Sequence, residues 1–273
     1  MLAEARRRLL LTRISQQGFA TLEDLSSSVG ASESTIRRDL EALDLAGSIK
    51  RTHGGAVCIG DVRAMPALDD RATAAAEEKR QIGRTAAALV RDGDTVLLDG
   101  GTTTLEVAKA LVGRPVQVVT NSLPIANLLT SSKETDLILI GGYIYPRTGV
   151  ALGPLAIATM KGLRVRLVMM GAGGIVAEGV YNSNSLLVET ERTMMACGQE
   201  VIVLADHTKF GQLSLTKLCD LEEISRLVVD RGLDEPYRDL LNSRGIPFIV
   251  AEHADDPANT GVATPPTTPR NGR

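Results

Sequence analysis

The feature that most constrains the fold is a series of short apolar runs between residues 95 and 251. The runs are TVLLD, VQVVT, LILIGG, RLVMMG, EVIVLAD, RLVVD and PFIVA, and amphipathic stretches separate them. Each run is apolar throughout rather than alternating, which is typical of strands covered on both faces in a mostly parallel sheet. We therefore expect an α/β domain with seven strands over residues 75–253.

The N-terminal part of the chain has a different pattern. Residues 4–17 have helical apolar spacing, Thr21 can cap a short second helix, and Gly30 supplies a turn. Ser32 can then cap a third helix that runs to about residue 45. Two helices joined by a few residues that include a glycine are the helix-turn-helix pattern.

A short hairpin is expected after the third helix. Residues 49–52 followed by two glycines fit a β-hairpin, which would be the wing of a winged helix-turn-helix over residues 1–57. Residues 58–74 have little periodicity and are expected to be a linker. The last stretch, 254–273, is rich in Pro, Thr and Asn and is expected to be a disordered tail.

Two adjacent arginines on the third helix indicate a nucleic-acid site. With Ile36, Leu40 and Leu43 on the buried face, Ser34, Arg38 and Glu41 point outward, and Thr35 and Arg37 flank them. The first turns of a recognition helix meet phosphates and base edges in the major groove of DNA. The expected DNA-facing residues of the helix and wing are Ser34, Thr35, Arg37, Arg38, Lys50, Arg51 and His53.

An alternative is that Arg37 and Arg38 belong to an ordinary solvated face. In that case they would pair with Asp39, Glu41 and Asp44, as charges on helices commonly do. The preceding helix, the turn and the basic hairpin together favour the DNA-binding interpretation.

Polar residues follow several of the expected strands. Ligands of open α/β sheets bind at the carboxyl ends of the strands, so these residues are expected to line a pocket. Lys209, in ADHTKFG, could pair with a phosphate or a sugar hydroxyl. The expected ligand-binding residues are Asp99, Gly100, Gly101, Thr102, Thr103, Thr104, Thr120, Asn121, Ser122, Gly141, Gly142 and Lys209.

The segment DGGTTT allows two interpretations. Its glycines, threonine hydroxyls and following helix N-terminus would suit a phosphate. Equally, Thr102 or Thr103 could simply cap the helix. The segment is not a P-loop, because no Gly-Lys-Ser/Thr follows the glycines.

Composition narrows the class of protein. The 273 residues are 44% apolar and 23% charged, and the net charge of −3 means that any DNA site depends on local charge. No run approaches the ~18 apolar residues of a membrane span. The three cysteines form no CxxC pair, so we expect reduced thiols in a cytoplasmic protein without a membrane partner.

No metal, cofactor or catalytic site is expected. His53, His207 and His253 are too scattered for a zinc site. GAGGIV fails the dinucleotide fingerprint because Val176 replaces the last glycine, and there is no GxSxG motif.

The sequence also resembles a known family. TIRRDLEALDLAGSIKRTHGGAV is similar to the recognition helix and wing of DeoR-family bacterial transcriptional regulators. DGDTVLLDGGTTT, VVTNSLPIAN, LILIGG and VLADHTKFG are similar to the C-terminal domain of that family. The resemblance implies a second domain with the fold of ribose 5-phosphate isomerase and glucosamine-phosphate deaminase. It also implies a phosphorylated sugar that releases a repressor from its operator.

The region GAGGIVAEGVYNSNSLLVETERTMM is the least regular part of this second domain. Within it, only Glu189, Glu191 and Arg192 are candidate pocket or interface residues. Where the isomerases carry an aspartate-rich loop after a strand, this chain has Gly171-Ala172-Gly173-Gly174.

The function we expect is a repressor of carbohydrate-metabolism genes that binds a double-stranded operator as a dimer or tetramer. The alternative is an active sugar-phosphate isomerase or deaminase with a DNA-binding domain, in which Asp99, Asp206 or Glu191 would serve as acid or base. An activator built from the same parts is a third possibility.

Overall fold

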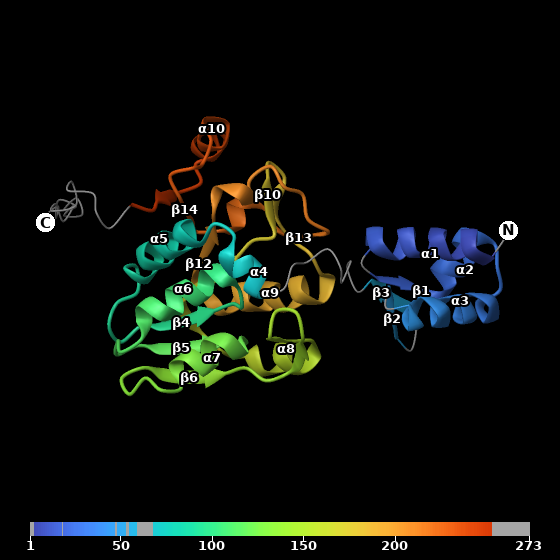
Figure 1. Cartoon of the computed structure of the whole chain (residues 1–273), viewed down its shortest axis with the longest axis horizontal. Helices are drawn as coiled ribbons and strands as arrows, with labels where there is room; N and C mark the ends of the chain where they lie inside the picture. Colours follow the sequence, from blue (N-terminus) through green and yellow to red (C-terminus); the bar gives the residue numbers. More distant parts are fainter. Residues whose placement is uncertain (1–2, 18, 47, 53–54, 59–67, 253–273) are drawn as a thin grey trace, which may run out of the picture.

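The computed structural model describes residues 3–17, 19–46, 48–52, 55–58 and 68–252, and Figure 1 shows it. The apolar residues of the N-terminal part form a core of their own, and those of the larger C-terminal part form further clusters. The expected tail lies outside the described residues, as does much of the expected linker. The described end of the linker range forms a short helix, α4 (Leu68–Thr73).

Three helices and a small antiparallel sheet make up the N-terminal unit. Leu10 and Ile14 of the first helix pack with Leu25, Ile36 and Leu40 of the next two in one buried cluster. The unit has the expected helix-turn-helix order. Its elements are α1 (Ala3–Gln17), β1 (Phe19–Thr21), α2 (Leu22–Val29), α3 (Glu33–Leu45), β2 (Ile49–Thr52) and β3 (Gly55–Cys58).

The helix boundaries of this unit follow from local chemistry. The Thr21 hydroxyl accepts from the backbone N–H of Asp24 at 3.1 Å, which confirms it as the cap of α2. Gly30 ends α2 with φ +64°, a left-handed conformation that glycine adopts without strain. Ser32 stands at the N-cap of α3, but the expectation that its side chain caps the helix is wrong.

The expected hairpin is confirmed. Strands β2 and β3 pair antiparallel, with Ile49 opposite Cys58 and Thr52 opposite Gly55. The sequence did not indicate β1, which pairs with β3 on its other side. Gly55 lies so close to β1 that a Cβ would come within 2.1 Å of the carbonyl oxygen of Ala20. This close approach explains the glycine.

The seven apolar runs of the sequence are the seven strands of one parallel sheet. Its order is β15-β14-β12-β9-β4-β5-β6, and each neighbouring pair is parallel. The strands are β4 (Thr95–Leu98), β5 (Gln117–Thr120), β6 (Asp136–Leu139), β9 (Val165–Gly171), β12 (Gly198–Ala205), β14 (Arg226–Val229) and β15 (Phe248–Val250).

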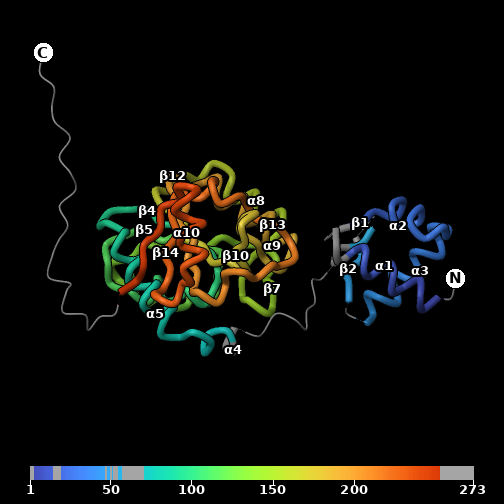
Figure 2. The backbone as a smooth tube through the Cα atoms, turned by 90° about the horizontal axis from the view of Figure 1, so that it is seen from above, coloured from blue at the N-terminus to red at the C-terminus, as the bar shows by residue number. Residues whose placement is uncertain are grey.

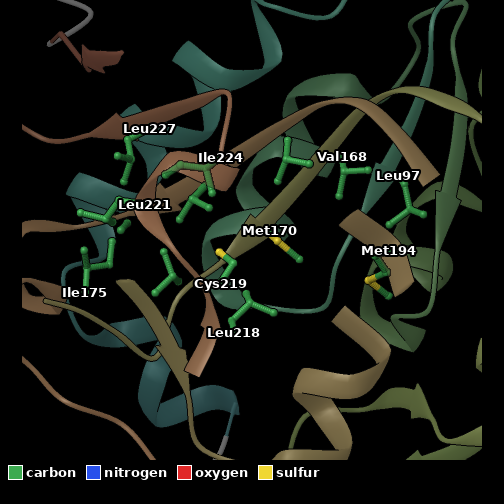
Figure 3. Close-up of a cluster of buried hydrophobic side chains, with 14 of the residues drawn as sticks. Leu97, Val168, Met170, Ile175, Met194, Leu218, Cys219, Leu221, Ile224 and Leu227 are labelled. Atoms are coloured by element: carbon green, nitrogen blue, oxygen red, sulfur yellow. The ribbon is translucent and has the colours of Figure 1, made fainter. Parts of the chain in front are cut away.

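Both faces of the inner strands of this sheet are covered, which explains why those strands are almost continuously apolar, whereas the edge strand β6 is largely exposed. Val96 and Leu98 of β4 pack on one side with α5, α6 and α7, whereas Leu97 packs on the other with α8 and α9. Figure 3 shows part of this second core, in which Leu97, Val168 and Met170 of the sheet lie near Met194 of α9. The helices are α5 (Ala76–Ala87), α6 (Thr102–Leu111), α7 (Leu123–Leu129), α8 (Pro154–Met160), α9 (Ser185–Cys197) and α10 (Glu235–Ser243).

Two small antiparallel sheets, which the sequence did not predict, complete the larger unit. One is a hairpin, and the other has the order β10-β11-β13. Two strands of this second sheet, β10 and β11, lie in the least regular region of the sequence. The strands are β7 (Tyr143–Tyr145), β8 (Val150–Leu152), β10 (Gly174–Val176), β11 (Gly179–Asn182) and β13 (Thr216–Cys219), and the 3-10 helices are η1 (His207–Lys209) and η2 (Leu221–Glu223).

Within the described ranges, no helix is long and apolar enough to cross a bilayer.

Candidate DNA-binding face and effector site

The outer face of α3 presents basic and hydroxyl groups as expected. Ile36, Leu40 and Leu43 are buried, whereas Ser34, Arg37 and Arg38 are exposed. Ser32 joins this face, because its hydroxyl lies 3.0 Å from the hydroxyls of both Ser34 and Thr35 instead of binding the backbone. A cluster of three hydroxyls therefore stands at the N-terminus of the helix, the end that meets DNA in helix-turn-helix proteins.

Asp39, the buried acid of α3, is paired with arginines of α1 and not with Arg38. Asp39 is 3% exposed and accepts from Nε of Arg6 at 2.6 Å and from Nε of Arg7 at 3.0 Å. These bonds tie α1 to α3, so Asp39 is a packing residue of the unit. The solvated-face alternative, in which Asp39 pairs with Arg37 or Arg38, is not what the structure shows.

Glu33 and Glu41 of α3 also have arginine partners other than Arg38. Glu41 lies 3.5 Å from a guanidinium nitrogen of Arg51, and Arg37 lies 3.5 Å from Glu33 in an exposed pair. Over the part of the chain that is described, Arg38 has no acidic partner. Exposed pairs at such distances contribute little, so Arg37 and Arg38 are both available to a polyanion.

The wing carries fewer described side chains. Arg51 lies on β2, is exposed, and its backbone N–H donates to Asp44 at 3.4 Å. Lys50 is also on β2, but its side chain lies outside what is described, and so does the whole of His53. Their contribution to DNA binding stays a prediction.

The effector site is expected where the strand order of the large sheet reverses. From β4 the chain continues to β5 and β6 on one side, and then returns to β9 on the other side of β4. A crevice forms at the carboxyl ends of two such strands, because their connections lead to opposite sides. The DGGTTT segment follows β4 and therefore lies at this point.

The start of α6 is open. Gly101 is its N-cap residue, and no side chain caps the helix, so Thr102 and Thr103 do not have the capping role that the sequence allowed. The Thr104 hydroxyl proton is not available to a ligand, because it is donated to the Gly101 carbonyl at 3.0 Å. The free N–H groups of α6 and the hydroxyls of Thr102 and Thr103 are the donors that an anion needs.

The residues at and just after the end of β5 mostly hold the edge of the sheet in place. The Thr120 hydroxyl donates to the Leu98 carbonyl at 2.7 Å, and the Ser122 hydroxyl caps α7 at 3.4 Å from the N–H of Ile125. Asn121 donates from Nδ2 to the Ala151 carbonyl at 3.1 Å, while its buried Oδ1 has no partner among the described residues. Of these three predicted ligand residues, Asn121 alone keeps a buried acceptor unused.

Two of the predicted glycines are explained by packing. A Cβ on Gly100 would lie 1.9 Å from Cγ1 of Val150, and one on Gly142 would lie 2.9 Å from the Leu152 carbonyl oxygen. Both glycines let β8 approach the sheet edge. Gly101 has more room, since its nearest neighbour would be Oγ1 of Thr104 at 3.4 Å, and Gly141 has open space around it.

Two carboxyl groups are buried beside this edge. Asp99 is 3% exposed and Glu191, on α9, is 0% exposed. Burial raises the pKa of Asp99 to about 7, although the N–H of Gly100 and the charge of Arg71 oppose the shift. Burial also raises the pKa of Glu191 well above its ordinary value, and the nearby Asp99 carboxylate adds to the shift.

One oxygen of each carboxyl is left without a partner. Nδ2 of Asn182 donates to Oε1 of Glu191 at 2.6 Å, whereas Oε2 of Glu191 and Oδ1 of Asp99 are buried without a hydrogen bond among the described residues. Unpaired buried acceptors are costly, and in native proteins they mark places that a ligand or water completes. Of the other two residues proposed from this region, Glu189 is exposed, and Arg192 donates to the Leu218 and Lys217 carbonyls.

Lys209 lies on η1 and is partly exposed. The preceding His207 is braced by Asp230, which accepts from its backbone N–H at 2.6 Å and lies 2.8 Å from its Nδ1. Burial lowers the pKa of the buried Lys79, the Asp206 charge opposes this shift, and the positive charge of Lys209 adds to it. Because η1 follows β12, Lys209 lies at the same carboxyl edge of the sheet as the other candidates.

Sequence reasoning missed a charged residue of this edge. Arg71 lies on α4, and its charge acts on Asp99. The residue fell in the range expected to be a linker, because a helix of six residues leaves almost no periodicity to detect. The described residues contain no cluster of three or more His, Cys, Asp or Glu side chains that could hold a metal ion.

Family models match both units. Residues 6–61 match the DeoR-like helix-turn-helix domain, and residues 74–231 match the DeoR C terminal sensor domain. Among solved structures, ribose 5 phosphate isomerase A from Neisseria gonorrhoeae is similar with a TM-score of 0.37 and 14% identity, over 50% of this chain and 53% of that chain.

Curated relatives extend over nearly the whole length. The HTH-type transcriptional repressor GlcR of Bacillus subtilis (strain 168) is 32% identical over 92% of this chain and 98% of its own. The putative aga operon transcriptional repressor of Escherichia coli O157:H7 is 30% identical over 90% of this chain and 93% of its own. These relatives are transcriptional regulators rather than enzymes, which goes against the isomerase alternative. The chain belongs to the DeoR family of transcriptional regulators.

Proposed function

We propose that this regulator is a cytoplasmic repressor of carbohydrate-metabolism genes, and that a phosphorylated sugar releases it from its operator. The observation that carries the effector half is the uncapped N-terminus of α6 at the switch point of the sheet, with the hydroxyls of Thr102 and Thr103 beside it. The two relatives described above are both named as transcriptional repressors, which supports a repressor role.

The site suits both parts of such a ligand. The donors at the start of α6 would take the phosphate, and the unpaired oxygens of Asp99, Asn121 and Glu191 would accept from sugar hydroxyls. The ligand would release DNA if it binds a conformation in which the recognition helices are misplaced, and only to the extent of that preference.

We also propose that the protein binds DNA as a dimer or tetramer. Strand β6 is the edge of the large sheet, and its Ile138 and Leu139 are exposed. Tyr143 and Leu155, which follow on β7 and α8, are 60% and 66% exposed. An apolar strip along an unpaired edge is typical of a surface that a second copy covers. Sedimentation of the full chain would contradict this proposal if it gave a monomer at micromolar concentration.

The experiment that tests the function is fluorescence anisotropy on operator DNA. DNA from upstream of the protein's own gene and of neighbouring sugar-metabolism genes is titrated with the protein, and a panel of sugar phosphates is then added. We expect one phosphorylated sugar to release the DNA while its unphosphorylated form does not. Tight binding that no member of the panel affects would refute the effector half.

Thr102→Val sharpens the test. The change removes a hydroxyl from the open end of α6 and keeps the side-chain volume, so we expect at least a tenfold higher effector concentration for release, equal to about 1.4 kcal/mol, with operator affinity unchanged. Thr159→Val is the matched control, because Thr159 is an exposed helical threonine of α8 whose hydroxyl bonds its own helix. A normal response in Thr102→Val would remove this residue from the site.

A further inference from the structure

Helix α4 lies beside the candidate phosphate site. It packs against α6, the helix whose open N-terminus forms the candidate phosphate site. Figure 1 shows α4 beside α6, and Figure 2 follows the backbone from α4 directly into α5. The Lys79 ammonium of α5 donates to the carbonyls of Arg71 and Ala74, which holds the end of α4 against the domain.

The guanidinium of Arg71, on α4, has two unused donors. Its Nε and Nη2 are both buried, and neither has a hydrogen-bond partner among the described residues. These two nitrogens form one edge of the guanidinium, the edge that binds both oxygens of a phosphate or carboxylate side-on. An unused edge of this kind is costly to bury, so it indicates an absent anionic partner.

Asp99 is a charged neighbour of Arg71. The nearby Asp99 charge opposes the lowering of the Arg71 pKa by burial, so the two groups attract each other. Yet no hydrogen bond joins them, and Oδ1 of Asp99 is itself buried and unpaired within the described ranges. Arg71 thus carries unused donors beside the unused acceptor of Asp99, and Asn121, directly after the neighbouring strand β5, keeps a further unused acceptor.

A phosphorylated polyhydroxy compound complements both sets. Its phosphate has only acceptors at neutral pH, and its hydroxyls can donate. We propose that Arg71 is the cation that binds the effector's phosphate, side-on through Nε–H and Nη2–H, beside the N-terminus of α6. Asp99 and Asn121 then accept from the hydroxyls. This inference rests on the proposed function and assigns to Arg71 the role that the sequence suggested for Lys209.

The position of Arg71 also connects the site to the DNA-binding unit. Helix α4 is the first element described after β3, the last strand of that unit. A phosphate held by Arg71 restrains the start of the sensor domain, where the chain arrives from the DNA-binding unit.

The test measures phosphate binding directly. Inorganic phosphate is titrated with the full chain at a temperature far below unfolding, and binding is followed by the ³¹P NMR linewidth, with chloride keeping ionic strength constant. We expect Arg71→Gln to weaken phosphate binding at least tenfold. Arg71→Lys keeps the charge but loses the planar edge, so its affinity should fall between those of the wild type and Arg71→Gln.

Two matched variants complete the design. Arg80→Gln makes the same change at an exposed arginine of α5 that pairs with Glu77, and it should bind phosphate like the wild type. Lys209→Gln should lose less affinity than Arg71→Gln. If Arg71→Gln is too unstable to study, phosphate affinity is compared between Arg71→Lys and Arg80→Lys. A loss of affinity in Arg71→Lys alone then supports the role of Arg71.

The outcomes separate the two proposals. Wild-type phosphate affinity in Arg71→Gln and Arg71→Lys overturns the role of Arg71 and leaves the phosphate site of α6 standing. Absence of phosphate binding by the wild-type protein overturns both. A tenfold loss in Arg71→Gln, with wild-type binding in Arg80→Gln, supports the inference.

Discussion

On α3 the arginines expected to meet DNA are in water, with Arg37 61% exposed, whereas at the sheet edge Asp99 and Glu191 are 3% and 0% exposed. The kind of ligand that each region is expected to bind explains why one set of charges is exposed and the other is buried. DNA carries a dense row of phosphates, so exposed cations suffice and binding depends on salt. A small ligand offers only a few groups, and those groups gain specificity when the protein's own donors and acceptors are already desolvated and unpaired.

The comparison also separates two kinds of buried charge. Asp39 in the N-terminal unit is buried with two arginine partners, while Asp99 and Glu191 each keep an unpaired oxygen. A fully paired group stabilises its unit, whereas an unpaired one destabilises it until a ligand arrives. The predictions below test this distinction.

The largest effect is expected at Asp99. Its folded pKa of about 7 lies above the ordinary value of 3.8. The stability this gives is therefore complete below about pH 4 and is lost as pH rises through 7. Asp99→Asn removes the ionisable group, so at pH 8 it should stabilise the sensor domain, by as much as about 4 kcal/mol.

Urea denaturation of the full chain at pH 5 and pH 8, followed by circular dichroism, measures the effect. Asp239→Asn, at an exposed position of α10, is the control. A wild-type pH dependence in Asp99→Asn would show that Asp99 is not the buried acid responsible.

The opposite result is expected for Asp39. Asp39→Ala leaves Arg6 and Arg7 without their carboxylate, and we expect the N-terminal unit to lose about 3 kcal/mol. Hydrogen exchange of the amides in α1 and α3 should then be faster by roughly a hundredfold. Glu41→Ala, whose partner Arg51 is exposed, should change exchange by less than threefold. Equal effects of the two changes would mean that burial of the pair contributes nothing.

The smallest effect is expected at Arg38. Arg38→Ala should weaken operator binding by ~1–3 kcal/mol if the side chain reads a base, or lower the salt dependence by about one ion if it meets a phosphate. Folding should be unaffected, because the side chain is exposed. Anisotropy titrations at several salt concentrations measure both quantities, with Arg91→Ala, an exposed arginine of the sensor domain, as the control. Unchanged affinity and salt slope would place Arg38 outside the interface.

Much of the fold could be predicted because its causes are local. The seven parallel strands were visible as apolar runs, and for inner strands such as β4 and β5 the reason is that a strand covered on both faces is apolar at nearly every position. The cap at Thr21 and the left-handed Gly30 likewise depend on neighbouring residues alone. The two antiparallel sheets of the larger unit were missed, because strands of three or four residues with glycines between them have no detectable period.

The site was only partly predictable. The loop after β4 was identified from its glycines and threonines, and the position of Asn121 from the end of β5. What the sequence by itself determined is which residues end the strands and which face of α3 is polar, since both follow from periodicity. Tertiary structure decided that Arg71 and Glu191 lie near Asp99, and that Asp39 belongs to Arg6 and Arg7. The physical reason is that charged groups interact with whatever lies near them in the folded protein. These residues are far apart in sequence, so their spacing along the chain does not reveal the pairing.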